Sequence, residues 1–221
     1  MNLGWKLALV QRRVASQSLL ATYTEERLPV ITEMLPLTRS LFDQIIAHRL
    51  TGVPRTSDLR QFGVNYRWSS IVLHNAEHKN TLGVGAYGAG RDGFVQPGDR
   101  APEAPGLVNL GTMEATSIFG ILSSCLHTVL VFTDSFEKAA AIIDVSNTCP
   151  SGTFQYAIIT RLSTVSCLNG LILQDHQGYA SRSYSYTGGV KVVVIRPDGF
   201  VGALLDGAGG LLKYIKLIFT V

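Results

Sequence analysis

Charged residues are scarce in this sequence. Asp, Glu, Lys and Arg make up 16% of its 221 residues and hydrophobic residues 46%, whereas a typical globular domain has about 25% charged residues. A chain of this length and composition can bury a sizeable core, which excludes disorder as its main state. The shortage of charge also indicates that part of the apolar surface is covered by a partner or by a further segment.

Basic clusters are missing as well, because Arg12-Arg13 is the only pair of adjacent basic residues. The net charge of +3 is spread along the chain, which argues against nucleic acid as a partner. Near the start, the apolar run from Leu7 to Val10 is too short for a secretion signal. We therefore expect a cytoplasmic protein.

Cysteine is rare, and Cys125, Cys149 and Cys167 form no C-x-x-C pair. An odd number of cysteines without that spacing argues against a disulfide framework and against a zinc cluster. We expect reduced, buried thiols and no bound metal.

A membrane span is not predicted either. The segment from Ala115 to Thr133 contains no charged residue and is just long enough to suggest one. Hydroxyl side chains and His127 interrupt it, and two short strands on either side of Ser123-Ser124 explain the pattern more simply.

The most regular pattern in the chain is a predicted hairpin. Val190 to Ile195 and Phe200 to Leu204 are apolar and rich in β-branched residues, and Arg196-Pro197-Asp198-Gly199 supplies the turn between them. The proline sets φ for the turn and the glycine tolerates positive φ. An uninterrupted apolar run belongs in a strand covered on both faces, so we expect this hairpin at the centre of the fold.

Helices and then extended chain are predicted before the sheet. Apolar residues recur at helical spacing over Asn2 to Arg13 and Ser16 to Leu50, where Pro29 and Pro36 should kink or divide the second helix. Asn65 to Leu73 fits a strand or an irregular arm, and the Gly- and Pro-rich chain after it indicates loop. We assign the helical segment to residues 1–52 and the arm and loop to 53–111.

From residue 112 onward the pattern becomes α/β. The predicted elements are strands at 118–122, 128–132 and 154–161, a helix at 135–143 capped by Asp134 or Ser135, an irregular segment at 175–189, the hairpin, and a final helix at 208–217. This order predicts a thioredoxin-like domain over residues 112–221, an α/β fold with a central mixed sheet.

Three blocks of the sequence resemble segments of one enzyme family. They are Asn2-Leu3-Gly4-Trp5-Lys6-Leu7-Ala8 with Leu19 to Val30, then Pro97 to Pro105, and last Val192 to Gly202. The first block resembles the segment after the last FAD-binding motif in flavin-dependent aromatic hydroxylases of the phenol 2-monooxygenase type. The second resembles the entry into that family's C-terminal thioredoxin-like domain, and the third resembles the closing hairpin of that domain.

The resemblance implies a parent enzyme that hydroxylates an aromatic ring with NADPH, FAD and dioxygen. In that family the FAD-binding motifs and the active-site residues precede a segment like Asn2 to Leu7, so we expect this chain to correspond to the C-terminal portion. We carry over no catalytic, cofactor-binding or metal-binding residue and expect the chain to be inactive alone. The missing N-terminal flavin domain would be its partner.

Two motifs have little support from their context. Gly83 to Gly88 matches the G-x-G-x-x-G dinucleotide fingerprint, but the residues after it cannot open a helix. His74-Asn75-Ala76-Glu77-His78 matches the H-x-x-E-H pattern of zinc peptidases, but its Asn and the glycines beyond favour a turn. We interpret both as structural loops.

Two further patterns also have a structural explanation. Ser135-Phe136-Glu137-Lys138 matches the S-x-x-K of acyl-serine enzymes without their partner motifs, so helix capping explains the serine. Redox thioredoxins carry C-x-x-C at this position, and its absence predicts no disulfide chemistry. A polar, aromatic loop could bind a ligand, although such loops are common at protein surfaces; it contains Tyr179, Ser181, Arg182, Ser183, Tyr184, Ser185 and Tyr186.

Two functions from different classes stay open. The first is a non-catalytic C-terminal module of a phenol-hydroxylase-like, FAD-dependent monooxygenase, contributing to folding and subunit contacts. The second is a stand-alone, homodimeric binding or interaction protein that kept the thioredoxin-like fold, lost flavin chemistry and reuses exposed apolar helix faces in the dimer. A thioredoxin-like or glutathione-binding enzyme is disfavoured by the missing cysteines.

Overall fold

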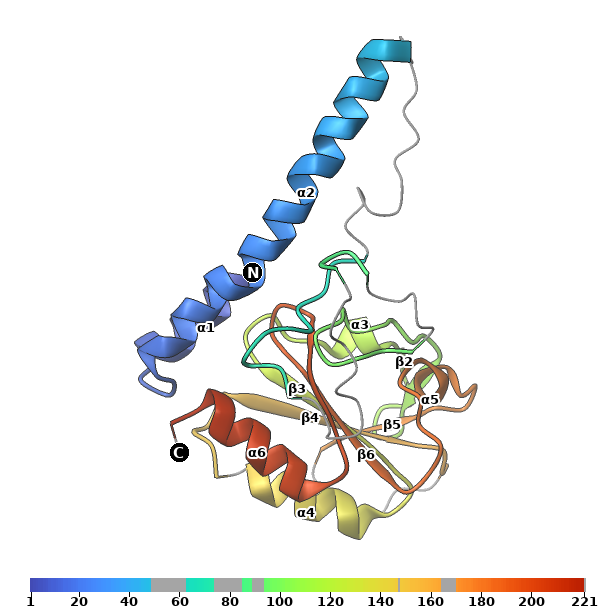
Figure 1. The fold of residues 1–221 in the computed structure, drawn as a ribbon. Helices are drawn as coiled ribbons and strands as arrows, with labels where there is room; N and C mark the ends of the chain where they lie inside the picture. Colours follow the sequence, from blue (N-terminus) through green and yellow to red (C-terminus); the bar gives the residue numbers. More distant parts are fainter. Residues whose placement is uncertain (49–62, 74–84, 89–93, 147, 164–169, 221) are drawn as a thin grey trace.

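Two N-terminal helices lie against an α/β domain, and the second helix projects far beyond it (Figure 1). The computed structural model describes residues 1–48, 63–73, 85–88, 94–146, 148–163 and 170–220. Helix α1 spans Asn2–Gln11, the short 3-10 helix η1 spans Gln17–Leu20, and helix α2 spans Ala21–His48. No helix in the described ranges is both long enough and apolar enough to cross a membrane.

The α/β domain is built on a mixed sheet of seven strands. They are β1 (Leu107–Asn109), β2 (Ala115–Thr116), β3 (His127–Thr133), β4 (Phe154–Thr160), β5 (Leu171–Gln174), β6 (Val190–Ile195) and β7 (Val201–Leu205). Their order across the sheet is β2-β1-β5-β4-β3-β6-β7. Strands β3, β4 and β5 run parallel, and the other neighbouring pairs are antiparallel.

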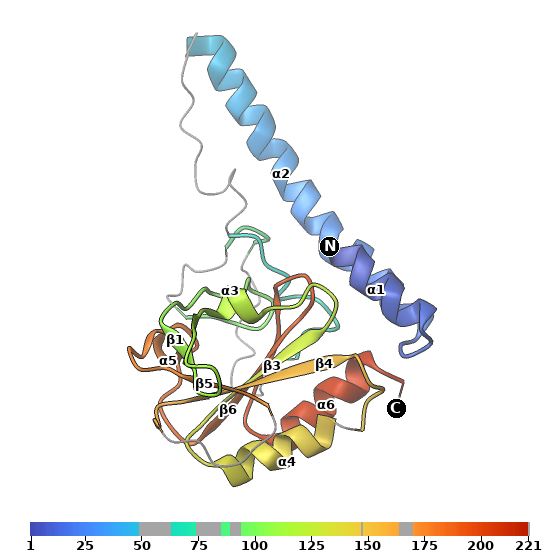
Figure 2. The same ribbon diagram turned by 180° about the vertical axis from the view of Figure 1, so that it is seen from behind.

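Helices cover both faces of this sheet. Helices α4 (Phe136–Ser146) and α6 (Ala208–Ile218) lie side by side on one face, and the short helices α3 (Ile118–Ile121) and α5 (Tyr179–Ser183) lie on the other side (Figures 1 and 2). Alternate side chains of β3 and β6 therefore enter two cores. The core beneath α1, α4 and α6 includes Val129, Val131, Val192 and Val194, and the opposite core includes Leu130, Phe132, Val193 and Ile195.

The expected α/β fold, with a central mixed sheet after an N-terminal helical segment, is confirmed. Strand β3, helix α4, strand β4, the β6–β7 hairpin and helix α6 follow one another in the predicted order. The residues of β6 from Val192 to Ile195 are fully buried, as expected of an apolar run covered on both faces. Residues 63–73 form an irregular arm, joined to β7 by a bridge between Leu73 and Ala203.

Of the two effects expected of Pro29 and Pro36, a kink or a division, the division is wrong, because helix α2 runs without interruption through both prolines. A proline lacks the amide that would bond the carbonyl four residues earlier. For Pro29 that carbonyl belongs to Glu25, and it accepts a hydrogen bond of 2.9 Å from the indole N–H of Trp68 instead. Pro36 and Thr32 are exposed, so water can satisfy the second carbonyl.

The strand expected at residues 118–122 is also wrong, because this segment forms helix α3. The Ser117 Oγ accepts a hydrogen bond of 3.2 Å from the amide of Gly120, and the Glu103 carboxylate accepts one of 3.1 Å from the amide of Phe119. These polar caps satisfy the first turn of a helix, and they outweigh the apolar pattern of the segment.

Candidate functional site

A cluster of buried charges joins the N-terminal helices to the α/β domain. Glu26 on α2 accepts a hydrogen bond of 2.7 Å from the Lys6 ammonium on α1. Its two oxygens also accept bonds of 2.6 Å and 3.0 Å from the Arg196 guanidinium, just after β6. All three side chains are fully buried.

Asp198, in the turn of the β6–β7 hairpin, completes this cluster. Its carboxylate accepts hydrogen bonds from Arg196 at 2.6 Å, from the Trp5 indole at 3.1 Å and from the Asn2 side-chain amide at 3.1 Å. The Arg-Pro-Asp-Gly segment thus does more than turn the chain, because its arginine and aspartate bind α1 and α2. We call Lys6, Glu26, Arg196 and Asp198 the junction cluster.

Burial and pairing have opposite effects on the pKa values of the junction cluster. Burial acts to raise the pKa of Glu26, but Arg196 and Lys6 outweigh it and hold this pKa at about 2. Burial lowers the pKa of Lys6 against the opposing effect of Glu26. Burial also acts to lower the pKa of Arg196, which Asp198 and Glu26 nevertheless raise above its usual value. Fully paired charges of this kind suit a structural role better than proton transfer near neutral pH.

His127 lies beside the junction cluster among aromatic rings. The rings of Trp5, Phe154, Tyr214 and Phe219 have their centroids 5.2 to 6.1 Å from that of the imidazole. Its Nε2 has no hydrogen-bond partner in the described part of the chain. Burial, with a smaller contribution from the charge of Arg196, lowers the pKa of His127 to about 3, so this side chain is neutral at physiological pH.

A second buried ion pair fixes the arm at residues 63–73. The Arg67 guanidinium donates to the Asp99 carboxylate at 2.7 Å and 2.9 Å. From the same arm, Ser69 donates to Glu26 at 2.8 Å, and the Tyr66 hydroxyl accepts a bond of 3.1 Å from Arg27 on α2. The arm is thereby tied to both the loop before β1 and the second helix.

The glycine motif contacts a carboxylate from the chain itself. The amide of Ala86 donates to Glu33 on α2 at 2.5 Å, and a Cβ atom on Gly85 would lie 2.7 Å from a Glu33 oxygen. Asn65 donates to the carbonyls of both loop residues at 3.0 Å. Because a carboxylate already accepts the hydrogen bond of the Ala86 amide, this amide is not free to bind a phosphate. Residues 83 and 84 of the motif lie outside the described residues.

The other sequence motifs have structural roles where they are described. The Ser135 Oγ accepts a hydrogen bond of 3.5 Å from the Lys138 amide, so Ser135 caps α4. Asp134 instead accepts bonds from Thr160 and from the amide of Arg161, at 2.9 Å and 3.0 Å. Burial acts to raise the pKa of Asp134, but these bonds lower it overall. The H-x-x-E-H motif at 74–78 lies outside the described residues.

The polar, aromatic loop supports its own backbone. Tyr184 is buried and donates to the carbonyl of Pro102 at 2.8 Å, and Tyr186 donates to that of Gly189 at 3.2 Å. Arg182 donates to the two carbonyls just before α5. These side chains do not converge on a common site.

Of the cysteines, Cys149 is buried with a free thiol, as expected, whereas Cys125 is exposed with a free thiol. Burial raises the pKa of the Cys149 thiol, so this thiol is unreactive. Cys167 lies outside the described residues. No group of three potential metal ligands occurs within the described ranges.

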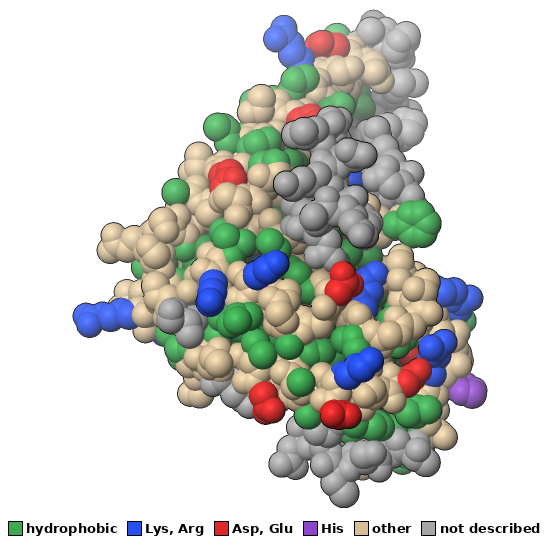
Figure 3. All heavy atoms as spheres, turned by 60° about the horizontal axis from the view of Figure 1, so that its bottom comes forward, with side chains coloured by type: hydrophobic (Ala, Val, Ile, Leu, Met, Phe, Trp, Pro, Cys, Tyr) green, Lys and Arg blue, Asp and Glu red, His purple; other side chains and the backbone are tan. Residues whose placement is uncertain are grey.

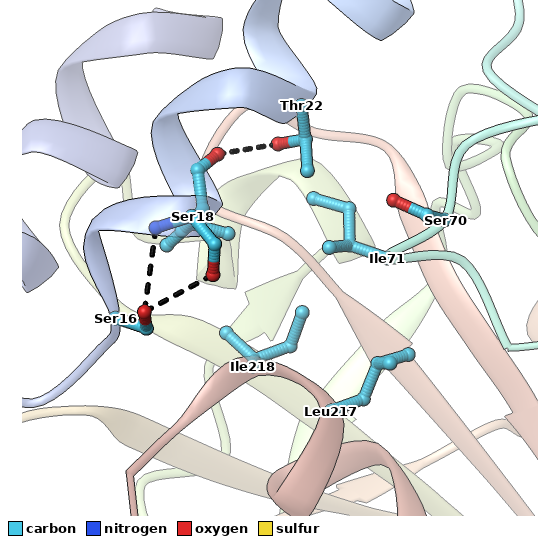
Figure 4. Close-up of a pocket in the computed structure, with 8 residues that line it drawn as sticks. Ser16, Ser18, Thr22, Ser70, Ile71, Leu217 and Ile218 are labelled. Carbon is cyan, nitrogen blue, oxygen red and sulfur yellow. Dashed lines mark hydrogen bonds between the residues drawn. The ribbon is translucent and has the colours of Figure 1, made fainter.

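A small cavity opens between η1, the start of α2, the arm and α6 (Figure 4). Its volume is about 230 Å³, and it is lined by Ser16, Ser18, Leu19, Thr22, Ser70, Ile71, Leu217 and Ile218. No local sequence pattern indicates this cavity, because its walls come from segments far apart in the chain.

A family model and two sequence relatives match this chain. Residues 1–38 match the family model described as FAD binding domain. A flavin-dependent monooxygenase of Mycobacteroides abscessus is 28% identical over 217 residues, which are 98% of this chain and 34% of the relative. Pentachlorophenol 4-monooxygenase of Sphingobium chlorophenolicum is 45% identical over 47 residues, which are 21% of this chain and 9% of that relative.

Solved structures share the fold. The flavin-dependent monooxygenase PieE, in complex with FAD and substrate, aligns with a TM-score of 0.66 at 18% identity. The alignment covers 98% of this chain and 42% of the PieE chain. Aklavinone-11 hydroxylase, with FAD and aklavinone, aligns with a TM-score of 0.67 at 22% identity. The alignment covers 98% of this chain and 38% of the hydroxylase chain.

The chain spans about a third of the length of the M. abscessus relative, and its match to pentachlorophenol 4-monooxygenase spans 9% of the length of that protein. The matched regions together extend over almost the whole chain, from the N-terminal helices to the α/β domain. This protein is therefore homologous to FAD-dependent monooxygenases.

Proposed function

We propose that this chain is the non-catalytic C-terminal module of an FAD-dependent aromatic-ring monooxygenase similar to phenol hydroxylase, and that it contributes to folding and subunit contacts. The junction cluster is the observation that carries this proposal. Lys6 and Glu26 belong to the segment that matches the FAD-binding family, and Arg196 and Asp198 belong to the α/β domain. Their buried contacts hold the α/β domain in a fixed position on the helices.

The chemistry of the described residues supports a non-catalytic role. The buried cations of the junction are paired with carboxylates, and the Ala86 amide is occupied by Glu33. FAD and NADPH would bind in the N-terminal flavin domain, which is the proposed partner, and the reduced flavin would supply the oxygen-transfer chemistry there. We place the complex in the cytoplasm.

The outward face of α2 is the proposed contact with that domain. Leu28, Ile31, Leu35, Phe42 and Ile46 recur at helical spacing and are 42% to 62% exposed, and we call them the α2 stripe. Figure 3 shows hydrophobic side chains along the projecting part of α2 with charged ones among them, and both kinds also lie on the face of the α/β domain in this view. A row of exposed apolar side chains of this kind is typical of a protein contact.

Co-expression tests the proposal. This chain, carrying an affinity tag, is produced together with the part of the M. abscessus relative that lies outside the match, and bound flavin is measured by its visible absorbance. We expect flavin to copurify with the complex and not with the chain alone. Flavin bound by the chain alone, or the absence of any complex, would contradict the proposal.

A second candidate function rests on the same α2 stripe. A homodimeric interaction protein would bury these side chains against a second copy of α2. Light scattering of the purified chain separates the two functions, because a stable dimer mass supports this second function and a monomer supports the first.

A further inference from the structure

The small cavity lies where three segments that are distant in sequence meet. Figure 4 shows residues from η1 and the start of α2 on one side, Ser70 and Ile71 from the arm on another, and Leu217 and Ile218 from α6 below them. Its volume of about 230 Å³ exceeds the roughly 150 Å³ of an apolar cavity that binds benzene. A molecule with a single substituted ring therefore fits.

One wall of this cavity is aliphatic. It is made by Leu19, Ile71, Leu217 and Ile218. A ring packed on this wall gains the free energy of apolar burial. A charged ligand would lose hydration against the same wall without gaining a counter-ion from it, so the wall favours an uncharged molecule.

Three of the four hydroxyl groups on the other walls have already used their protons. Thr22 donates to a backbone carbonyl at 2.6 Å, Ser70 donates to Glu25 at 2.7 Å, and Ser18 donates to Ser16 at 3.1 Å. A hydroxyl group has one proton and two lone pairs. These three oxygens therefore meet a ligand as acceptors, which favours a ligand that donates a hydrogen bond over a carboxylate.

We infer that this cavity is a binding site for a small, uncharged hydroxyl compound with one ring. The ring lies on the aliphatic wall, and the ligand hydroxyl donates to Thr22, Ser70 or Ser18. Because the site is shared by the N-terminal helices, the arm and α6, the bound molecule stabilises their contact. This site goes beyond the proposed function and does not depend on it.

Fluorine NMR of three matched probes tests the inference. Para-fluorophenol has a ring and a donor, fluorobenzene lacks the donor, and para-fluorobenzoate carries a negative charge. With this chain in solution, we expect the resonance of para-fluorophenol to broaden much more than those of the other two. Equal broadening of para-fluorophenol and fluorobenzene, or no broadening of any probe, would overturn the inference.

Two variants locate the site and one serves as the control. Thr22→Val removes one acceptor at nearly constant shape, and we expect about a fivefold weaker affinity for para-fluorophenol. Ser70→Leu fills the cavity from an exposed position and should abolish the broadening, which keeps the test decisive if the first variant folds poorly. Ser40→Ala, at an exposed position further along α2, should leave the broadening of the para-fluorophenol resonance unchanged. Undiminished broadening in Ser70→Leu, with folding verified by circular dichroism, would place the probe elsewhere and refute the site.

Discussion

Glu26 is the residue on which the contact between helices and sheet depends most. Its carboxylate accepts hydrogen bonds from Lys6, Arg196 and Ser69 in a fully buried setting. Glu26→Gln leaves two buried cations without that negative charge, and breaking such a buried pair costs about 3–5 kcal/mol. Urea unfolding should therefore show a loss of this size in the free energy of unfolding.

The matched control is Glu137→Gln, in the exposed first turn of α4. Surface substitutions of this type change stability by about 0.5 kcal/mol or less. If the two variants lost the same stability, the buried charges would not be what holds the junction together.

His127 gives the protein a specific pH dependence. Its pKa is about 3 in the folded protein, against an ordinary 6.5. Between these values the unfolded chain binds a proton that the folded protein does not, so stability is complete above pH 6.5 and falls toward lower pH by up to about 1.4 kcal/mol per pH unit. Glu26, with a folded pKa of about 2 against an ordinary 4.5, makes the fall steeper only below pH 4.5.

The variant His127→Phe separates the effect of His127 on the pH dependence of stability from that of Glu26. It retains a ring among the aromatic neighbours and removes the titrating group. The free energy of unfolding should become nearly independent of pH between 6.5 and 4.5. Its decrease below pH 4.5, which Glu26 causes, should persist. Urea titrations at a series of pH values measure this, and an unchanged slope above pH 4.5 would rule out His127 as its source.

At the scale of elements, β7 and α6 pack closely at a glycine. A Cβ atom on Gly202 would lie 2.8 Å from Cζ of Tyr214, whose ring is fully buried. Gly202→Ala should cost about 1–3 kcal/mol through overpacking. Gly209→Ala, on α6 where nothing lies within 4 Å of the new atom, should stabilise the helix by up to about 1 kcal/mol. Thermal unfolding should show midpoint shifts of opposite sign, and shifts of the same sign would count against this packing.

The longer elements could be predicted from the sequence, because each has its own periodic pattern. Strands β3 and β6 and helices α4 and α6 are of this kind. Strands β1, β2 and β5 contain only two to four residues, too few for a pattern, and they exist because a neighbouring strand pairs with them. The continuity of α2 through Pro29 also depends on tertiary structure, since Trp68 bonds the carbonyl that the proline leaves free.

The junction cluster could be predicted only in part. The Arg196-to-Gly199 turn follows from its residue types, and Lys6 lies in a block with a family resemblance. Glu26 pairs with Lys6 and Arg196, which lie 20 and 170 positions away from it in the sequence. No local sequence pattern indicates this pairing. The same holds for Glu33, which contacts the loop that resembles a dinucleotide motif.

At the scale of the whole molecule, the α2 stripe is the surface that we propose binds the flavin domain. Leu35 is 61% exposed, so Leu35→Asp should change the free energy of unfolding by about 0.5 kcal/mol or less. A charge in an apolar contact should nevertheless prevent association with the flavin domain in the co-expression experiment. Full retention of the complex, measured as flavin per tagged chain, would place the contact elsewhere.

A flavin titration of the purified chain tests the proposed non-catalytic role most directly. FAD is added to micromolar protein, and its absorbance spectrum is recorded together with the mass from light scattering. We expect an unperturbed flavin spectrum, because the junction cations are paired with carboxylates and the Ala86 amide with Glu33. A perturbed spectrum that saturates with protein would contradict the proposed role and would show that this chain binds the cofactor itself.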